Sequence, residues 1–213
     1  MTTAPLEIAT AQEVLANGVV RECHHHFAAK PTARELGSLE IVPDPIKVKL
    51  VDHLKARLGN SFYENLHYHG GLAFNPSDVG SGGRDAKIPA YHFEFTFSMP
   101  EAGVKEYCAQ IDLSSRGRVE REIDLPEVAR DAKKGTIIPL TQALQTAETE
   151  GVPRESALVE LGYEASSDLI VWQISYTKKD ESGETVLLTL DMNAHTGQKI
   201  TWHAQYLRFH KPA

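Results

Sequence analysis

Two stretches of the chain repeat the same pattern, and this repeat constrains the fold more than any other feature. Residues 91–97 (YHFEFTF) align without a gap on residues 170–176 (IVWQISY), and the same offset of 79 places residues 111–113 (IDL) on residues 190–192 (LDM). Each copy has the pattern of an aromatic-rich alternating strand, a turn, a second strand and a glycine-containing turn. The sequence therefore predicts a duplicated β-hairpin unit.

Helical patterns precede or flank these hairpins. Helices are expected at 10–29, 45–58 and 139–148, and a short helical segment at 153–161. The clearest is 45–58, because Pro45 suits the first helical position and Gly59 suits the stop. Its apolar stripe is expected to lie across a sheet.

Extended patterns fill most of the remaining chain. Strands are expected at 61–74, 89–98, 104–114, 118–124, 168–177, 185–192 and 198–208. Each half thus runs from a helix into an antiparallel meander, which predicts an α+β fold with helices packed on one sheet face. The charged connector at 126–135 divides the chain into an N-terminal helix and linker (1–39), a first repeat (40–128) and a second repeat (136–213).

The second half carries short motifs that occur together in one known family. Residues 138–143 (IPLTQA), Trp172 in its strand, and residues 190–197 (LDMNAHTG) resemble the helix start, the Trp-bearing strand and the last turn of PepSY-type domains. The likeness covers roughly 137–203 and reaches the first half only through the repeat. It implies two tandem PepSY-like repeats with a cystatin-like sheet and helix. Because members are mostly non-catalytic modules, some of them inhibitory parts of peptidase precursors, the resemblance also implies binding without catalysis.

Composition restricts the class of protein. Hydrophobic residues make up 41% of the 213 residues and charged residues 24%, so the chain can bury a core. The formal charge of −7 argues against a nucleic-acid partner, which needs clustered Lys and Arg. No segment has the apolar length of a membrane helix and the N-terminus lacks signal-peptide features, so we expect a cytoplasmic protein without a membrane partner. Cys23 and Cys108 are far apart, so both are expected to be buried free thiols.

Ten histidines prompt a metal hypothesis. His67 and His69 lie two residues apart in an expected strand, so their side chains point the same way and could share one metal ion. A third ligand would come from His92 or Asp78. The alternative is that His67 and His69 are half-exposed sheet residues hydrogen-bonded to their neighbours. The consecutive His24–His26 would splay about 100° apart around a helix and cannot all ligate one ion. No cofactor is expected.

Two further groups of residues are candidates for a functional role. The segment at 75–87 is rich in Gly, Ser and Asp, and its charged residues Asp78, Arg84 and Asp85 are candidates for partner binding on a long surface loop. Asp112 and Asp191 occupy equivalent positions in the repeat. They could form a paired carboxylate site, but their place before matching turns favours turn capping through backbone N–H groups.

No nucleophile has a catalytic sequence context. Ser114 and Ser115 lie outside a Gly-x-Ser-x-Gly motif, and Cys108 lies within an expected strand. The sequence therefore favours a non-catalytic module that binds a protein or peptide, with inhibition of a partner enzyme as the sharpest version. Two alternatives stay open: an acidic immunity- or antitoxin-type protein that masks a basic partner, and a metal-binding protein or enzyme that uses His67 and His69.

Overall fold

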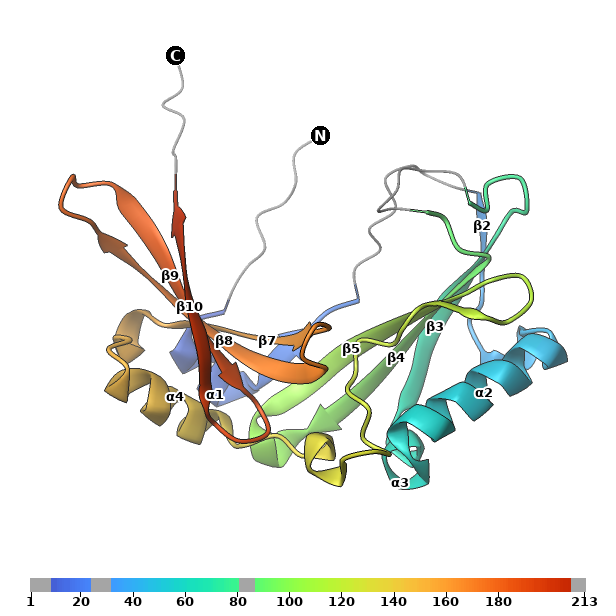
Figure 1. The fold of residues 1–213 in the computed structure, drawn as a ribbon, viewed down its shortest axis with the longest axis horizontal. Helices are drawn as coiled ribbons and strands as arrows, with labels where there is room; N and C mark the ends of the chain where they lie inside the picture. The colour runs from blue at the N-terminus through green and yellow to red at the C-terminus, as the bar shows by residue number, and fades with distance from the viewer. Residues whose placement is uncertain (1–8, 24–31, 81–86, 208–213) are drawn as a thin grey trace, which may run out of the picture. The chain divides into compact units, whose positions relative to one another are not determined.

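The computed structural model describes residues 9–23, 32–80 and 87–207, and it has an α+β fold, as predicted. The chain divides into two compact units. Unit 1 comprises Met1–Arg21, Met99–Lys105 and Thr136–Ala213, and unit 2 comprises Glu22–Ser98 and Glu106–Gly135. Each unit contains a β-sheet and α-helices (Figure 1).

The sheet of unit 2 has the strand order β5-β4-β3-β2, with β6 paired to β5. Its strands are β2 (Ala33–Glu35), β3 (His67–Phe74), β4 (Tyr91–Met99), β5 (Val104–Leu113) and β6 (Val119–Arg121). The pairs β2–β3, β3–β4 and β5–β6 are antiparallel. Phe93, Phe95 and Phe97 are buried at alternate positions of β4, so one face of this strand is fully apolar.

Helix α2 (Asp44–Leu58) confirms the prediction at 45–58. Its buried residues recur every four positions, which places them on one face of the helix: Ile46, Leu50, Leu54 and Leu58. Burying each of these side chains contributes roughly 1.5–3 kcal/mol. Helix α3 (Asn60–Glu64) follows directly, and the ring of Phe62 contacts that of Phe97 edge-on at 5.5 Å. The strand predicted at 61–74 was thus wrong for its first residues and begins at His67.

The sheet of unit 1 is antiparallel, with the order β10-β9-β8-β7. Its strands are β7 (Leu158–Glu164), β8 (Leu169–Lys179), β9 (Thr185–Asn193) and β10 (Lys199–Tyr206). Helix α4 (Leu140–Thr149) confirms the helix expected after Pro139 and buries Leu140, Ala143, Leu144 and Ala147. Trp172 of β8 is fully buried in this unit.

The N-terminal helix is shorter than the sequence predicted. Helix α1 (Ala11–Asn17) begins at Thr10, whose side chain and that of Glu13 form a capping box. It ends at Gly18, where φ is +79°, and the chain continues as strand β1 (Val19–Arg21) instead of as helix to residue 29. The Val19 N–H donates to the Gly103 carbonyl at 2.8 Å, beside the start of β5. Residues 24–31, including His24–His26, lie outside the described part of the chain.

The segment predicted as helical at 153–161 divides into a 3-10 turn and the start of a strand. A single 3-10 turn covers Arg154–Ser156, and β7 begins at Leu158. In β7 the buried residues Val159 and Leu161 alternate with half-buried ones, which is the period of a strand. Further 3-10 turns lie at Leu39–Ile41, Pro100–Ala102 and Ala132–Gly135. No helix of the described residues is long and apolar enough to cross a membrane.

The expectation of free thiols was wrong, because Cys23 and Cys108 form a disulfide. Their Cα atoms are 5.2 Å apart, although 85 positions separate them in the sequence. Cys108 lies in β5, and Cys23 follows β1 by two residues. Linear spacing carries no information on such a pair, because the fold brings the two residues together.

Candidate functional site on the sheet of unit 2

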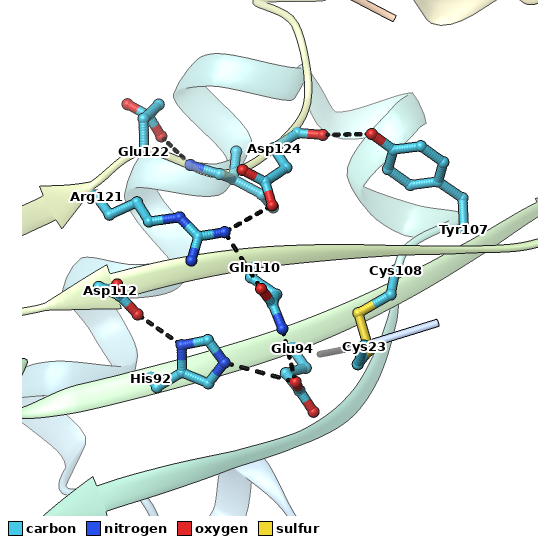
Figure 2. Close-up of polar contacts among 11 residues, drawn as sticks. Cys23, His92, Glu94, Tyr107, Cys108, Gln110, Asp112, Arg121, Glu122 and Asp124 are labelled. Atoms are coloured by element: carbon cyan, nitrogen blue, oxygen red, sulfur yellow. Dashed lines mark hydrogen bonds and ion pairs between the residues drawn. A yellow bond between two sulfur atoms is a disulfide. The ribbon is translucent and has the colours of Figure 1, made fainter. Parts of the chain in front are cut away.

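One face of β4 and β5 carries polar side chains that are nonetheless buried (Figure 2). They are His92, Glu94, Gln110 and Asp112, whose exposed fractions range from 1% for His92 to 9% for Asp112. They alternate with the apolar residues of the opposite face, because successive side chains of a strand point to opposite sides. Buried ionisable groups are costly unless paired, so a cluster of this kind marks a candidate functional site.

His92 lies between two carboxylates. Its Nδ1 is 2.6 Å from Asp112 Oδ1, and its Nε2 is 3.5 Å from Glu94 Oε1. Burial lowers the pKa of His92, but the hydrogen bonds with Asp112 and Glu94 and the negative charges of these two carboxylates together outweigh burial and raise the pKa above its usual value. The arrangement therefore favours an imidazolium that neutralises part of the charge of the two carboxylates.

A second chain of hydrogen bonds fixes the orientation of Glu94. The Gln110 Nε2 donates to Glu94 Oε1 at 2.9 Å, and Arg121 Nη2 donates to Gln110 Oε1 at 3.2 Å. The same Arg121 nitrogen donates to Asp124 Oδ2 at 2.7 Å. Figure 2 shows this chain running from β6 across β5 to β4. Glu94 Oε1 therefore lies against both Gln110 and His92, and Gln110 is itself held by Arg121.

A β-bulge places His69 beside this cluster. Tyr68 pairs with Phe95 and Gly70 pairs with Glu94, so His69 is an extra residue between adjacent rungs of the ladder. Tyr68 packs its ring edge-on against Phe95 at 5.6 Å, on the apolar face. Among the residues that the structure describes, one group brings three potential metal ligands together: the ligand atoms of Cys23, His69 and Glu94 all lie within 4.8 Å of one another.

The sequence-predicted metal ligands are only partly gathered at this place. His69 belongs to the group, whereas His67 pairs with Thr96 at the exposed start of β3. His92 contacts Asp112 and Glu94. Asp78 accepts a hydrogen bond from the Thr32 N–H at 3.1 Å, which anchors its own loop. A metal ion shared by His67 and His69 stays a prediction.

The candidate loop residues Arg84 and Asp85 lie outside the part of the chain that the structure describes. Asp78, the third member of that set, is half-buried, and the backbone from Asn75 to Gly80 forms turns. The hydrogen bond from Thr32 ties Asp78 to the chain before β2. Partner binding by Asp78, Arg84 and Asp85 therefore stays a prediction.

The turn-capping interpretation of the two equivalent aspartates was wrong. Asp112 bonds to His92 on the sheet face, and Asp191 accepts hydrogen bonds from Gln173 at 3.2 Å and from His203 at 2.8 Å. In the turn after Asp191, the side chain of Asn193 accepts the backbone N–H groups of residues 195 and 196 instead. Both aspartates thus share a role as imidazole partners on a strand.

A second candidate surface is the edge strand β10 of unit 1. In the described chain β10 pairs with β9 alone, whereas the other edge strand, β7, is hydrogen-bonded by residues 9–11. All residues of β10 are exposed except the half-buried Trp202. Among them are Ile200 and Tyr206, with exposed fractions of 44% and 56%. An exposed edge with apolar side chains is a surface to which another strand can add.

Comparisons with known proteins add no information on the chemistry of this site. No protein-family model matches the chain, and neither a curated protein nor a solved structure matches it. Sequence reasoning missed Glu94, Gln110 and Cys23 as members of the cluster. One signal was available for Glu94, because a carboxylate between Phe93 and Phe95 in an aromatic strand must either face water or find a buried partner.

Proposed function

We propose that this protein is a non-catalytic module that binds an extended segment of a partner protein or peptide along β10. The observation that carries the proposal is the exposed, unshared edge of this eight-residue strand in the described chain. Adding a strand to a sheet edge gives affinity through main-chain hydrogen bonds and specificity through alternate side chains. Inhibition of a partner enzyme by this contact is the sharpest version of the proposal.

The backbone groups that such a partner would use can be identified from the register. The Leu207 N–H donates to the Thr185 carbonyl at 2.9 Å, and the pairing runs without a shift from Thr201 to Tyr206. In an antiparallel pair, alternate residues direct their N–H and C=O groups toward the partner strand. The backbone N–H and C=O groups therefore face β9 at Thr201, His203 and Gln205. They face the open edge at Trp202, Ala204 and Tyr206.

The side chains of β10 also favour the addition of a partner strand at this edge. Trp202, Ala204 and Tyr206 share one face, and the ring of Trp202 contacts Tyr176 edge-on at 6.3 Å. Trp202 pairs with the fully buried Leu190, so this apolar face continues the buried side of β9 toward the sheet edge. A partner strand with apolar residues at alternate positions would extend that burial.

The two-repeat, PepSY- or cystatin-like architecture belongs to the same proposal. It is supported by the repeat positions: β4 and β8 cover the two aromatic stretches, and each neighbours a strand with the apolar-Asp-apolar motif, β5 or β9. Modules of that kind bind partners without catalysing a reaction, which agrees with a function carried by a strand edge.

A proline in β10 tests the proposal. Ala204→Pro removes one N–H that faces the open edge and leaves the ladder to β9 intact, because edge strands tolerate proline where the N–H faces solvent. Ala204→Ser keeps that N–H and is the matched control. Tagged wild-type protein and both variants would be used in parallel pull-downs from the native host's lysate, with quantitative mass spectrometry, after thermal melts show that Tm agrees within about 3 °C.

The proposal expects one stoichiometric partner that wild type and Ala204→Ser retain and that Ala204→Pro retains about tenfold less. Equal retention by all three proteins, or no stoichiometric partner at low salt, would overturn it. Loss of the partner from all three proteins at high salt would instead indicate charge-driven masking of a basic partner by the acidic chain.

A further inference from the structure

We propose that unit 2 contains a redox-controlled zinc site: reduction of the Cys23–Cys108 disulfide releases a thiolate that binds Zn²⁺ together with His69 and Glu94. The inference is independent of the binding function proposed for β10. It rests on the three-residue group whose ligand atoms lie within 4.8 Å of one another, and on the disulfide that holds one of its members.

The three residues are of the types that zinc prefers. Zn²⁺ is bound by Cys thiolate, His nitrogen and Asp or Glu oxygen, in tetrahedral sites with four ligands. Cys23, His69 and Glu94 supply one ligand of each type from three separate segments of the fold. The fourth position falls to a water molecule or to Cys108, whose sulfur is freed beside that of Cys23 when the disulfide opens.

The disulfide determines whether the site exists. The thiolate is the metal-binding form of cysteine, so the oxidised pair withholds a ligand. A dithiol reductant attacks the disulfide, the bond between the two sulfurs breaks, and the reductant is released as a cyclic disulfide after giving two electrons and two protons. Zn²⁺ then displaces the proton of the Cys23 thiol, so metal binding releases a proton to solvent. A small disulfide oxidant reverses the sequence by thiol–disulfide exchange: it accepts two electrons and two protons and leaves as two thiols, the bond between the two cysteine sulfurs forms again, and the ion is released.

The surroundings of Glu94 match those of a metal ligand. Ligating carboxylates are hydrogen-bonded by outer residues that fix their orientation. Gln110 donates to Glu94 at 2.9 Å and is itself held by Arg121 at 3.2 Å. The carboxylate is therefore held in place before any ion arrives, which lowers the ordering cost of binding.

The three ligands differ in exposure, and this difference gives the ion a route from solvent. Glu94 is buried, Cys23 is half-buried and His69 is exposed, so the group runs from the interior of the sheet face to solvent. His69 is the bulged residue of β3, and bulges commonly re-aim a side chain next to a functional site. An ion could thus enter from the side of His69.

The test compares zinc binding by the oxidised and the reduced protein. The full chain is reduced with dithiothreitol, freed of reductant by anaerobic gel filtration, and titrated with Zn²⁺ alone against a chromogenic chelator of known affinity. The proposal expects one Zn²⁺ per reduced chain and an affinity about 100-fold lower for the oxidised chain. Co²⁺ in place of Zn²⁺ is expected to give a thiolate charge-transfer band in the reduced chain alone.

Variants identify the ligands. His69→Ala and Glu94→Gln are expected to lower the zinc affinity of the reduced chain about 100-fold, and Gln110→Ala about tenfold. His67→Ala is the matched control, because His67 is an exposed histidine of the same strand outside the ligand group, and it is expected to bind as wild type does. Circular dichroism of each reduced variant checks that it is folded.

Three outcomes would overturn the inference. They are the absence of zinc binding by the folded reduced chain, equal affinity in both redox states, and equal loss of affinity in His67→Ala and His69→Ala. If reduction itself unfolds unit 2, Cys108→Ser serves as the second protein, since it frees the Cys23 thiol without reductant. In that variant the inference expects zinc binding that Cys23→Ser lacks, and no zinc binding by Cys108→Ser would contradict it.

Discussion

The Nδ1 atom of His92 lies 2.6 Å from Oδ1 of Asp112 on neighbouring strands, and both side chains are buried. A charge-assisted hydrogen bond in such surroundings is strong, because little water competes for either group. Removing one partner leaves the other buried without its counter-charge. The stability of unit 2 should therefore respond to this pair more than to its exposed ion pairs.

Substituting Asp112 tests the energetic weight of the pair. We expect Asp112→Asn to lower the free energy of unfolding by about 1.5–3 kcal/mol, the range for hydrogen bonds to charged groups. Asp191→Asn is the control, because the imidazole of its partner His203 is 60% exposed and an exposed pair contributes less than about 1 kcal/mol. Urea unfolding at a pH near 6 measures both variants. Equal losses in the two variants would contradict the difference in burial.

The pH dependence of stability is expected to follow His92. The pKa of His92 is raised in the folded protein, since burial is outweighed by the hydrogen bonds with Asp112 and Glu94 together with the charges of these carboxylates. Its contribution is therefore fully present below the pKa of the unfolded chain, about 6.5. It is lost as the pH rises through the higher folded-state pKa.

Urea unfolding of the oxidised, metal-free protein from about pH 5 to pH 9 measures this loss. In His92→Gln the fall in stability over this range is expected to be smaller than in wild type. Identical pH profiles for the two proteins would show that another group titrates. The same range leaves ordinary carboxylates ionised, so they do not obscure the comparison.

The disulfide is expected to stabilise the folded chain. It closes a loop between residues 85 positions apart, and disulfides of this kind contribute about 2–5 kcal/mol by restricting the unfolded chain. Reduction should lower the denaturation midpoint by the corresponding amount. A double variant with both cysteines replaced by alanine should be insensitive to reductant, and a thiol assay should detect no free thiol in the oxidised protein. A midpoint unchanged by reduction would contradict the expectation.

Helix α2 provides a test of the core. Leu54 is fully buried in the helix face that packs inward, so Leu54→Ala is expected to cost about 2–5 kcal/mol of unfolding free energy. Val48 lies on the same helix but is 54% exposed, and Val48→Ala is expected to change stability by less than about 0.5 kcal/mol. Equal effects at both positions would mean that the helix packs through another face.

The helices α2 and α4 could be predicted from the sequence, because apolar residues at a spacing of three and four identify the buried face locally. The hairpin strands β4, β5, β8 and β9 were equally accessible through their alternation and their repeat. Strand β7 was missed, since its short run of Leu, Val and Gly does not distinguish a strand from a helix segment by periodicity alone.

The candidate site was only partly predictable, because it depends on register and on distant pairing. His69 was a candidate from its place in a strand, but its neighbours Glu94 and Cys23 are set by the rungs of β3 and β4 and by the disulfide. Neither the register of these strands nor the disulfide pairing can be predicted from the local sequence. Turn chemistry was assigned to Asp112 because it precedes a turn, yet the strand continues one residue further and turns its side chain toward His92.

The bulge at His69 has a consequence for how this face can change. Rungs Tyr68–Phe95 and Gly70–Glu94 are complete without His69, so position 69 belongs to the sheet without contributing a rung of its own. A substitution there replaces one group displayed beside Glu94 and leaves the pairing of both strands untouched. Deletion of the residue would instead restore a regular ladder. The side chain at position 69 can therefore change in chemical type without any change in the pairing of β3 with β4.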